Sequence, residues 1–144
     1  MNRVISSVFF ALLPLLSFSQ NDSLSLLRYP SMIDAFNRAY PQEKAYLHFD
    51  NTGYFIGETV RFKAYVVDCS LDSLSRLSSV LYVELVSPGG DVLDTRKIRL
   101  ENGLGAGDIK LDNVLTSGFY EIRAYTRWMV NWGSEACFSR VFPI

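Results

Sequence analysis

The sequence is poor in the side chains that most often build catalytic and metal sites, since its 144 residues include one histidine and two cysteines. It also lacks an excess of one charge: 14 Lys and Arg residues stand against 15 Asp and Glu, for a formal net charge of −1. A protein that binds nucleic acid neutralises phosphates with a basic patch, and the sequence has no basic run of that kind. Nucleic-acid binding is therefore not expected.

The potential catalytic residues that are present form no recognisable motif. His48 and Asp50 lie close together, but a structural zinc ion takes about four ligands, so this pair is a poor metal site. Asp50, Asp68 and Asp72 could supply oxygen ligands, yet their spacing matches no known calcium loop. No serine or cysteine lies in a nucleophile elbow, and no glycine-rich phosphate loop follows a strand. We therefore predict a protein that is not an enzyme and that holds no metal or cofactor.

The N-terminus has the pattern of an export signal. One basic residue precedes an apolar run over residues 4–16, and Ser17 and Ser19 provide the small residues of a cleavage site before Gln20. The run is shorter than the roughly 20 apolar residues of a membrane-spanning helix. We predict a signal peptide over residues 1–19 and an exported chain, in the periplasm or at the outer membrane, without a transmembrane segment.

Residues 20–41 are expected to form a linker and one short helix. Ser31 can cap a helix that begins at Met32 and ends at Ala39, before Pro41. Its apolar residues recur at helical spacing: Met32, Ile33, Phe36 and Ala39. The helix either packs on the following domain or acts as a spacer.

From residue 42 onward the apolar residues recur with a period of two, which indicates strands with one buried face. The pattern predicts seven strands, over residues 44–50, 59–68, 80–86, 92–100, 107–111, 119–127 and 137–142. The side chains expected inside are Ala45, Leu47, Phe49, Val60, Phe62, Ala64, Val66, Leu81, Val83, Leu85, Ile109, Leu111, Tyr120, Ile122 and Ala124. Short strands at regular spacing favour an all-β, seven-stranded antiparallel β-sandwich of immunoglobulin or fibronectin type III type over residues 42–144.

A tyrosine lies near the start of the sixth strand, where sandwich domains often have a tyrosine corner. Leu115, Gly118 and Tyr120 form the pattern Leu-x-x-Gly-x-Tyr. In such a corner the ring is buried and the hydroxyl bonds to nearby backbone, which closes the crossover between sheets. The alternative is an ordinary buried tyrosine.

The two cysteines follow the second predicted strand and open the seventh. If the strands alternate in direction, Cys69 and Cys137 share one end of the domain, and an exported protein can form disulfides. A bond between them requires Cα atoms closer than about 7 Å. The sequence leaves open a disulfide or two separate thiols.

Four residues at the end of the sixth strand are candidates for binding a partner: Tyr125, Arg127, Trp128 and Trp132. Aromatic residues and arginine concentrate binding energy at interfaces, so the four could form a protein-, peptide- or carbohydrate-binding patch. The alternative is that both tryptophans only pack over the end of the core.

Several segments together indicate a family: Asp50, Tyr54, residues 57–64 (GETVRFKA), residues 88–92 (PGGDV) and residues 115–124 (LTSGFYEIRA). Over about residues 40–144 the chain is similar to the second macroglobulin domain of the alpha-2-macroglobulin family, as found at the N-terminus of large exported Bacteroidetes proteins. The resemblance implies a corner in which Gly57 turns the chain and Glu58 helps to close the bend. Ile56 stands where the family usually has proline.

The resemblance also implies a link with endopeptidase inhibition. The family's thioester motif, Cys-Gly-Glu-Gln, is absent from this sequence, and no long protease-sensitive segment is present. We therefore predict a structural or interaction module, the first domain of a larger cell-envelope protein, whose partners are neighbouring domains or other envelope proteins. An endopeptidase-inhibitor component and a carbohydrate- or peptide-binding module are the alternatives.

Overall fold

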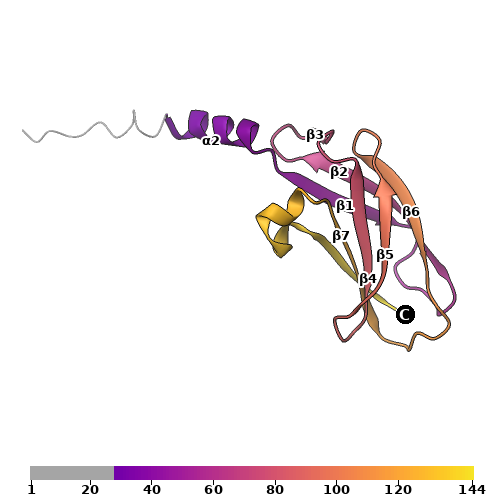
Figure 1. Ribbon diagram of the computed structural model, residues 1–144. Helices are drawn as coiled ribbons and strands as arrows, with labels where there is room; N and C mark the ends of the chain where they lie inside the picture. Colours follow the sequence, from indigo (N-terminus) through magenta and orange to yellow (C-terminus); the bar gives the residue numbers. More distant parts are fainter. Residues whose placement is uncertain (1–27) are drawn as a thin grey trace, which may run out of the picture.

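The computed structural model describes residues 28–144, which form a two-sheet β-sandwich with a helix projecting from one end (Figure 1). Sheet A contains β1 (Glu43–Phe49), β2 (Thr59–Asp68), β3 (Ser73–Leu74) and β6 (Leu104–Lys110). Sheet B has the order β5 (Val92–Arg99), β4 (Val80–Val86), β7 (Phe119–Tyr125) and β8 (Phe138–Pro143). The helical segments are α2 (Arg28–Ala39) and the two 3₁₀ turns η1 (Met129–Trp132) and η2 (Ser134–Ala136). The predicted all-β antiparallel sandwich is confirmed.

The strand order places β2 at the centre of sheet A, with β1 on one side and with β6 and β3 on the other. In sheet B the central strands are β4 and β7. All pairs of strands in the two sheets are antiparallel. Because α2 leads into the start of β1, the loops that follow β1, β4 and β6 lie at the end of the sandwich opposite to the helix (Figure 1).

The core consists of the inward faces of the two sheets. All fifteen side chains that the period-two pattern places inside are buried. Phe142 of β8 joins them, with its ring 4.6 Å from that of Phe49 and 5.6 Å from that of Tyr54. This aromatic cluster fills the core at the end opposite to the helix and links β1 and β8, one edge strand from each sheet.

Two features of sheet A differ from the prediction. The two-residue strand β3 is too short to show a period, and it raises the count among the described residues to eight. Strand β6 begins at Leu104, three residues before its predicted start at Gly107. The pattern fails there because Gly105 and Gly107 occupy inward positions without an apolar side chain. A Cβ atom on Gly107 would lie 2.5 Å from Ile98 Cδ1 and 3.0 Å from Phe62 Cζ, so a larger residue there would force these side chains to move.

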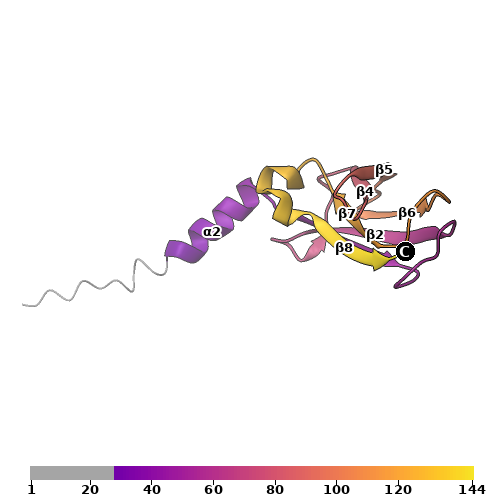
Figure 2. The same cartoon turned by 90° about the horizontal axis from the view of Figure 1, so that it is seen from below.

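Helix α2 begins at Arg28, four residues earlier than predicted, and ends at Ala39 as predicted. Ser31 therefore lies inside the first turn, where its hydroxyl donates to the Arg28 carbonyl at 2.8 Å, and the prediction that it caps the helix is wrong. No residue of α2 is buried, and the helix extends away from the sandwich (Figure 2). Between residues 28 and 144 no helix is long and apolar enough to cross a membrane. The predicted signal peptide lies outside the described residues.

Candidate functional site

The four residues of the predicted aromatic patch lie in two separate places. Tyr125 is on the outer face of sheet B, where its ring stacks on Tyr82 at 5.6 Å and its hydroxyl donates to Glu84 at 2.6 Å. The Arg127 guanidinium lies 5.8 Å from the centre of the Tyr82 ring. Both residues are thus bound to neighbours on the same sheet, and this group is a polar surface with one stacked aromatic pair.

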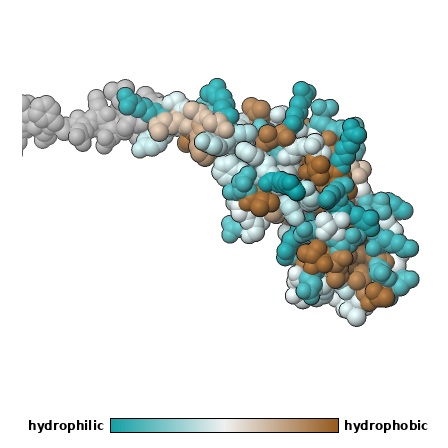
Figure 3. Space-filling view, in the orientation of Figure 1, coloured by the Kyte–Doolittle hydropathy of each residue, from teal (hydrophilic) through white to brown (hydrophobic). Residues whose placement is uncertain are grey.

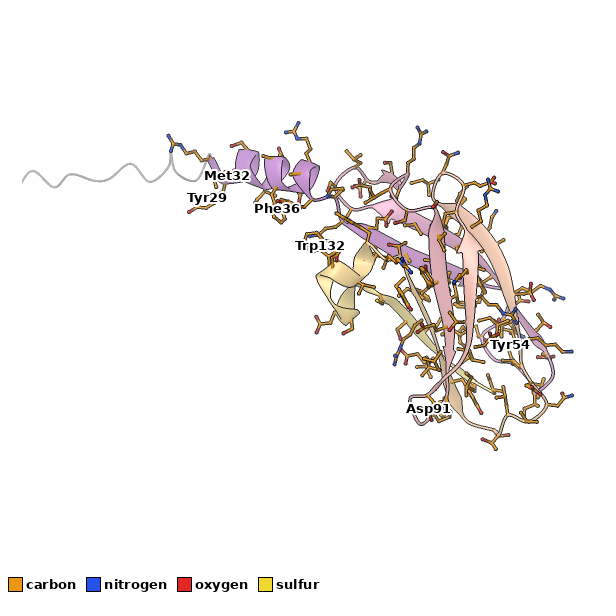
Figure 4. The ribbon with its side chains drawn as sticks, viewed as in Figure 1. Tyr29, Met32, Phe36, Tyr54, Asp91 and Trp132 are labelled. Carbon is orange, nitrogen blue, oxygen red and sulfur yellow. The ribbon has the colours of Figure 1, made fainter. Side chains whose placement is uncertain are left out.

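The two tryptophans lie at the other place, beneath the end of α2. Trp128 is half-buried, and its indole N–H donates to the carbonyl of Pro41, between α2 and β1. Trp132 is half-buried too, and its ring meets that of Phe36 edge-on at 6.3 Å (Figure 4). The Trp132 indole N–H is buried and has no hydrogen-bond partner among residues 28–144. Both tryptophans therefore join the helical segment to the sandwich, and they do not form one platform with Tyr125 and Arg127.

A buried carboxylate that the strand prediction missed lies at the same end of the domain. Glu43, the first residue of β1, is 4% exposed. Its two oxygens accept hydrogen bonds from the hydroxyls of Ser75, Ser78 and Thr126 and from the Ser78 backbone N–H. Thr126 directly follows β7 and Ser78 precedes β4, so Glu43 links sheet A to sheet B. The sequence signal was the alternation Ala45, Leu47, Phe49, which places Glu43 inside when it is extended back by two residues.

The corner before β2 is built from the Gly57-Glu58 motif. Gly57 has a φ of +87°, which favours glycine. A Glu58 carboxylate oxygen accepts a hydrogen bond from the Phe55 N–H at 2.8 Å, and the Glu58 N–H donates to the Phe55 carbonyl. Asp50 accepts hydrogen bonds from the Tyr54 hydroxyl at 2.7 Å and from the Arg61 N–H. These contacts fix the loop between β1 and β2, so the residues of this motif act in the architecture of the domain.

Two tyrosines are expected to ionise unusually late. Burial, together with the hydrogen bond to Asp50, raises the pKa of Tyr54 to about 12. The hydrogen bond to Glu84, together with burial, raises the pKa of Tyr125 to about 12. A titration followed by phenolate absorbance should show both groups ionising about two pH units above exposed tyrosines. Because these pKa values are raised on folding, the stabilisation is present below pH 10 and is lost as the pH rises towards 12.

Single replacements assign each late titration. Tyr54→Phe should remove one late group and leave the other, and Tyr125→Phe should do the reverse. If both tyrosines of the native protein ionise near pH 10, the two hydrogen bonds to carboxylates do not exist in solution.

The pattern Leu115, Gly118, Tyr120 forms the crossover from β6 to β7. The Tyr120 ring is buried, and its hydroxyl donates to the Thr116 carbonyl at 2.7 Å, four residues upstream. Leu115 packs against the core, and Gly118 exchanges two backbone hydrogen bonds with Ile144. The segment therefore ties the crossover to the C-terminal end of β8.

The two cysteines are free thiols in the structure, so the disulfide considered from the sequence is not formed there. Cys69 is exposed, and Cys137 is half-buried beside β1 and β2. Burial raises the pKa of the Cys137 thiol, and the nearby Glu84 carboxylate raises it further. A thiol with a raised pKa is a weak nucleophile at neutral pH, so Cys137 has the environment of a packing residue.

The candidate metal ligands do not come together. Among residues 28–144 no three His, Cys, Asp or Glu side chains are grouped so that they could hold a metal ion. His48 is exposed on the outer face of β1. Of the three aspartates considered for calcium, Asp50 bonds to Tyr54, and Asp68 accepts from the Ser70 N–H.

Two exposed apolar surfaces lie at opposite ends of the molecule. The first, which we call the helix stripe, consists of Tyr29, Met32, Ile33, Phe36 and Tyr40, each about half exposed or more. The second lies on the loops 50–58, 87–91 and 112–118, which we call the loop pole. Its most exposed apolar side chains are Phe55 (79%) and Val114 (81%), and Phe119 (70%) lies beside it. Figure 3 shows apolar side chains gathered at the lower end of the sandwich, opposite to the helix.

No protein-family model and no curated protein sequence matches the chain. The fold is similar to bacterial alpha-2-macroglobulins of known structure. The Salmonella protein is 25% identical, with a TM-score of 0.57, over 71% of this chain and 6% of that chain. The trypsin-activated Escherichia coli protein is 24% identical, with a TM-score of 0.58, over 74% of this chain and 7% of that chain.

The native form of the E. coli protein gives the same result, with a TM-score of 0.58 at 22% identity over 71% of this chain. The present chain thus spans less than a tenth of the length of these proteins. The similarity covers the greater part of the chain, and it agrees with the motifs from which the resemblance was drawn. The resemblance is therefore confirmed, and the sandwich has the fold of a macroglobulin-type domain.

Proposed function

We propose that this domain is a non-enzymatic structural and interaction module within a larger exported protein of the cell envelope, corresponding to a second macroglobulin domain. The observation that carries the proposal is that its hydrogen-bonded polar groups serve to hold the fold together. Glu43 links the two sheets, and the Tyr120 hydroxyl closes a crossover. Asp50 and Tyr54 fix the corner before β2. Each of these groups bonds within the protein itself, as in a scaffold.

Neighbouring domains are the partners that suit this scaffold. The solved structures that resemble it are chains more than ten times longer than the matched segment. The helix stripe and the loop pole expose large apolar side chains at both ends of the domain. Exposed apolar groups of this kind mark protein contacts, so the ends of the sandwich are the surfaces that we assign to contacts with other domains. Export is supported by the sequence pattern of residues 1–19.

Endopeptidase inhibition is the alternative that needs a direct test. The residues after Cys69 and Cys137 are Ser-Leu and Phe-Ser, so neither cysteine lies in the thioester motif of the family. The test incubates trypsin with a molar excess of the protein and then measures cleavage of a large protein substrate and of a small chromogenic peptide. We expect both activities to be unchanged relative to an equal mass of serum albumin, and no trypsin adduct on a denaturing gel.

A selective loss of activity towards the large substrate, with the small peptide still cleaved, would contradict the scaffold proposal. That result would show that trypsin is enclosed or masked by this chain. The albumin control separates it from simple competition between two protein substrates.

A further inference from the structure

Helix α2 is a short helix without a buried residue. It has 12 residues and none of them is buried, although its apolar side chains recur at helical spacing. Isolated helices of about 12–15 residues or fewer are marginal in water. Among the described residues, its ring contact with the sandwich is the one between Phe36 and Trp132. The helix stripe therefore requires a cover that the described part of the chain does not supply.

The charges near the two apolar surfaces are complementary. Helix α2 carries Arg28 and Arg38 against the single Asp34. The three loops of the loop pole contain four acidic residues and no Lys or Arg: Asp50, Glu58, Asp91 and Asp112. Figure 4 shows Tyr29 and Met32 on the helix at one end of the molecule, and Tyr54 and Asp91 near the other. The helix thus carries a net positive charge, and the loops at the other end carry a net negative charge that Arg61 and Lys110, beside Asp50 and Asp112, offset in part.

We propose that the helix stripe of one copy of this chain binds the loop pole of a second copy, in a head-to-tail arrangement. This inference rests on the proposed function and names the partner of its two apolar surfaces: the domain that contacts them is a second copy of the module itself. The contact is heterologous, because it joins two different surfaces. Each added copy therefore leaves one free helix stripe and one free loop pole, so that assembly continues with concentration unless the rotation closes a ring.

The area available makes this a weak contact. If a large apolar side chain has an area of about 200 Å², the five residues of the helix stripe expose roughly 550 Å². A contact that covers this stripe and a similar area of the loop pole buries on the order of 1,000 Å² in total, at the lower end of specific interfaces. The opposite charges should bring the two surfaces together, and their effect should weaken in high salt.

The test uses two variants of the purified protein and analytical ultracentrifugation over a range of concentrations. The stripe variant carries Met32→Ser and Ile33→Ser, which leaves the contact between Phe36 and Trp132 intact, and the pole variant carries Phe55→Ser and Val114→Ser. All four side chains are exposed, so both variants should keep the melting temperature of the parent protein. The control, Leu104→Ser, changes an exposed apolar residue of β6 outside the helix stripe and the loop pole.

The parent protein and the control should show a mean mass that rises with concentration and falls in high salt. Each variant alone should associate at least tenfold more weakly than the parent protein. It should therefore be monomeric at the concentrations at which the mean mass of the parent protein rises. An equimolar mixture of the two variants should form a dimer and nothing larger, because only one intact stripe and one intact pole can meet.

Three results would overturn the proposal. The first is a parent protein that stays monomeric at all concentrations. The second is a pole variant that still forms a dimer, because that would show that two helix stripes pair with each other. The third is a monomeric protein that sediments with anionic lipid vesicles through its helix stripe, since the cover would then be a membrane.

Discussion

Replacing Glu43 by alanine is expected to lower the free energy of unfolding by about 3–5 kcal/mol, because three hydroxyls and one backbone N–H lose their acceptor together. A buried donor left without a partner costs roughly 1–3 kcal/mol, and hydrogen bonds to a charged group are the stronger kind. Not all four costs add, since hydroxyls can rotate and water can enter the space left by the side chain. For a domain of about 100 residues the melting temperature should fall by roughly 12–20 °C.

Glu58→Ala is the matched control for this experiment. Glu58 is also a glutamate that accepts from a backbone N–H, but it is exposed and makes one such bond. Its loss should cost about 1 kcal/mol. Glu43→Gln should fall between the two, because the amide keeps one acceptor oxygen and brings an NH₂ donor towards hydroxyls that are already donating. If Glu43→Ala and Glu58→Ala destabilise the domain equally, Glu43 does not link the two sheets in solution.

The sequence predicted the sandwich because burial in an antiparallel sheet has a period that can be read directly. Strands β2 and β4 have the predicted boundaries for this reason. Glu43 also falls at an inward position of this period-two pattern. A charged residue is not expected to be buried there until its hydrogen-bond partners are known. Those partners, Ser75, Ser78 and Thr126, lie 32 to 83 residues away along the chain. No local pattern identifies them.

The predicted aromatic patch shows a second limit of sequence analysis: residues that are close in sequence need not share one surface. Tyr125, Arg127, Trp128 and Trp132 are close in sequence, and closeness in sequence suggested one surface. The strand ends at Tyr125, and the following residues turn into η1, so the tryptophans lie under α2 while Tyr125 stays on the face of sheet B. Their separation depends on contacts with Phe36, Pro41 and Tyr82, which come from other parts of the chain.

Gly103 has close backbone contacts that the sequence does not show. In the turn before β6, Asn102 and Gly103 both have positive φ, which is typical of a tight hairpin turn. The dipeptide Asn-Gly is typical of such a turn, but it does not show that Gly103 lies against the backbone of β2. Packing at that position depends on residues far away in the sequence, and so it is visible only in the structure.

Replacing Gly103 by alanine is therefore expected to destabilise the domain by about 2–5 kcal/mol. Its φ of +78° costs an L-residue about 1–2 kcal/mol. An added Cβ would also lie 2.5 Å from the Val66 carbonyl oxygen and 2.9 Å from that of Ser75. Backbone atoms cannot turn aside as a flexible side chain can, so β2 or the segment after β3 must shift, which typically costs a further 1–3 kcal/mol. The Val66 N–H donates to the Gly103 carbonyl, and that bond would be disturbed as well.

Gly90→Ala separates these two contributions. Gly90 has a φ of +94°, but an added Cβ would meet nothing within 4 Å. This variant should show only the conformational cost, about 1–2 kcal/mol. Urea denaturation of both variants measures their losses in free energy of unfolding. The loss in Gly103→Ala should exceed that in Gly90→Ala by at least 1 kcal/mol. Equal losses would mean that the turn can move away from β2 without cost, and that the close contact between Gly103 and the Val66 carbonyl does not restrain the sheet.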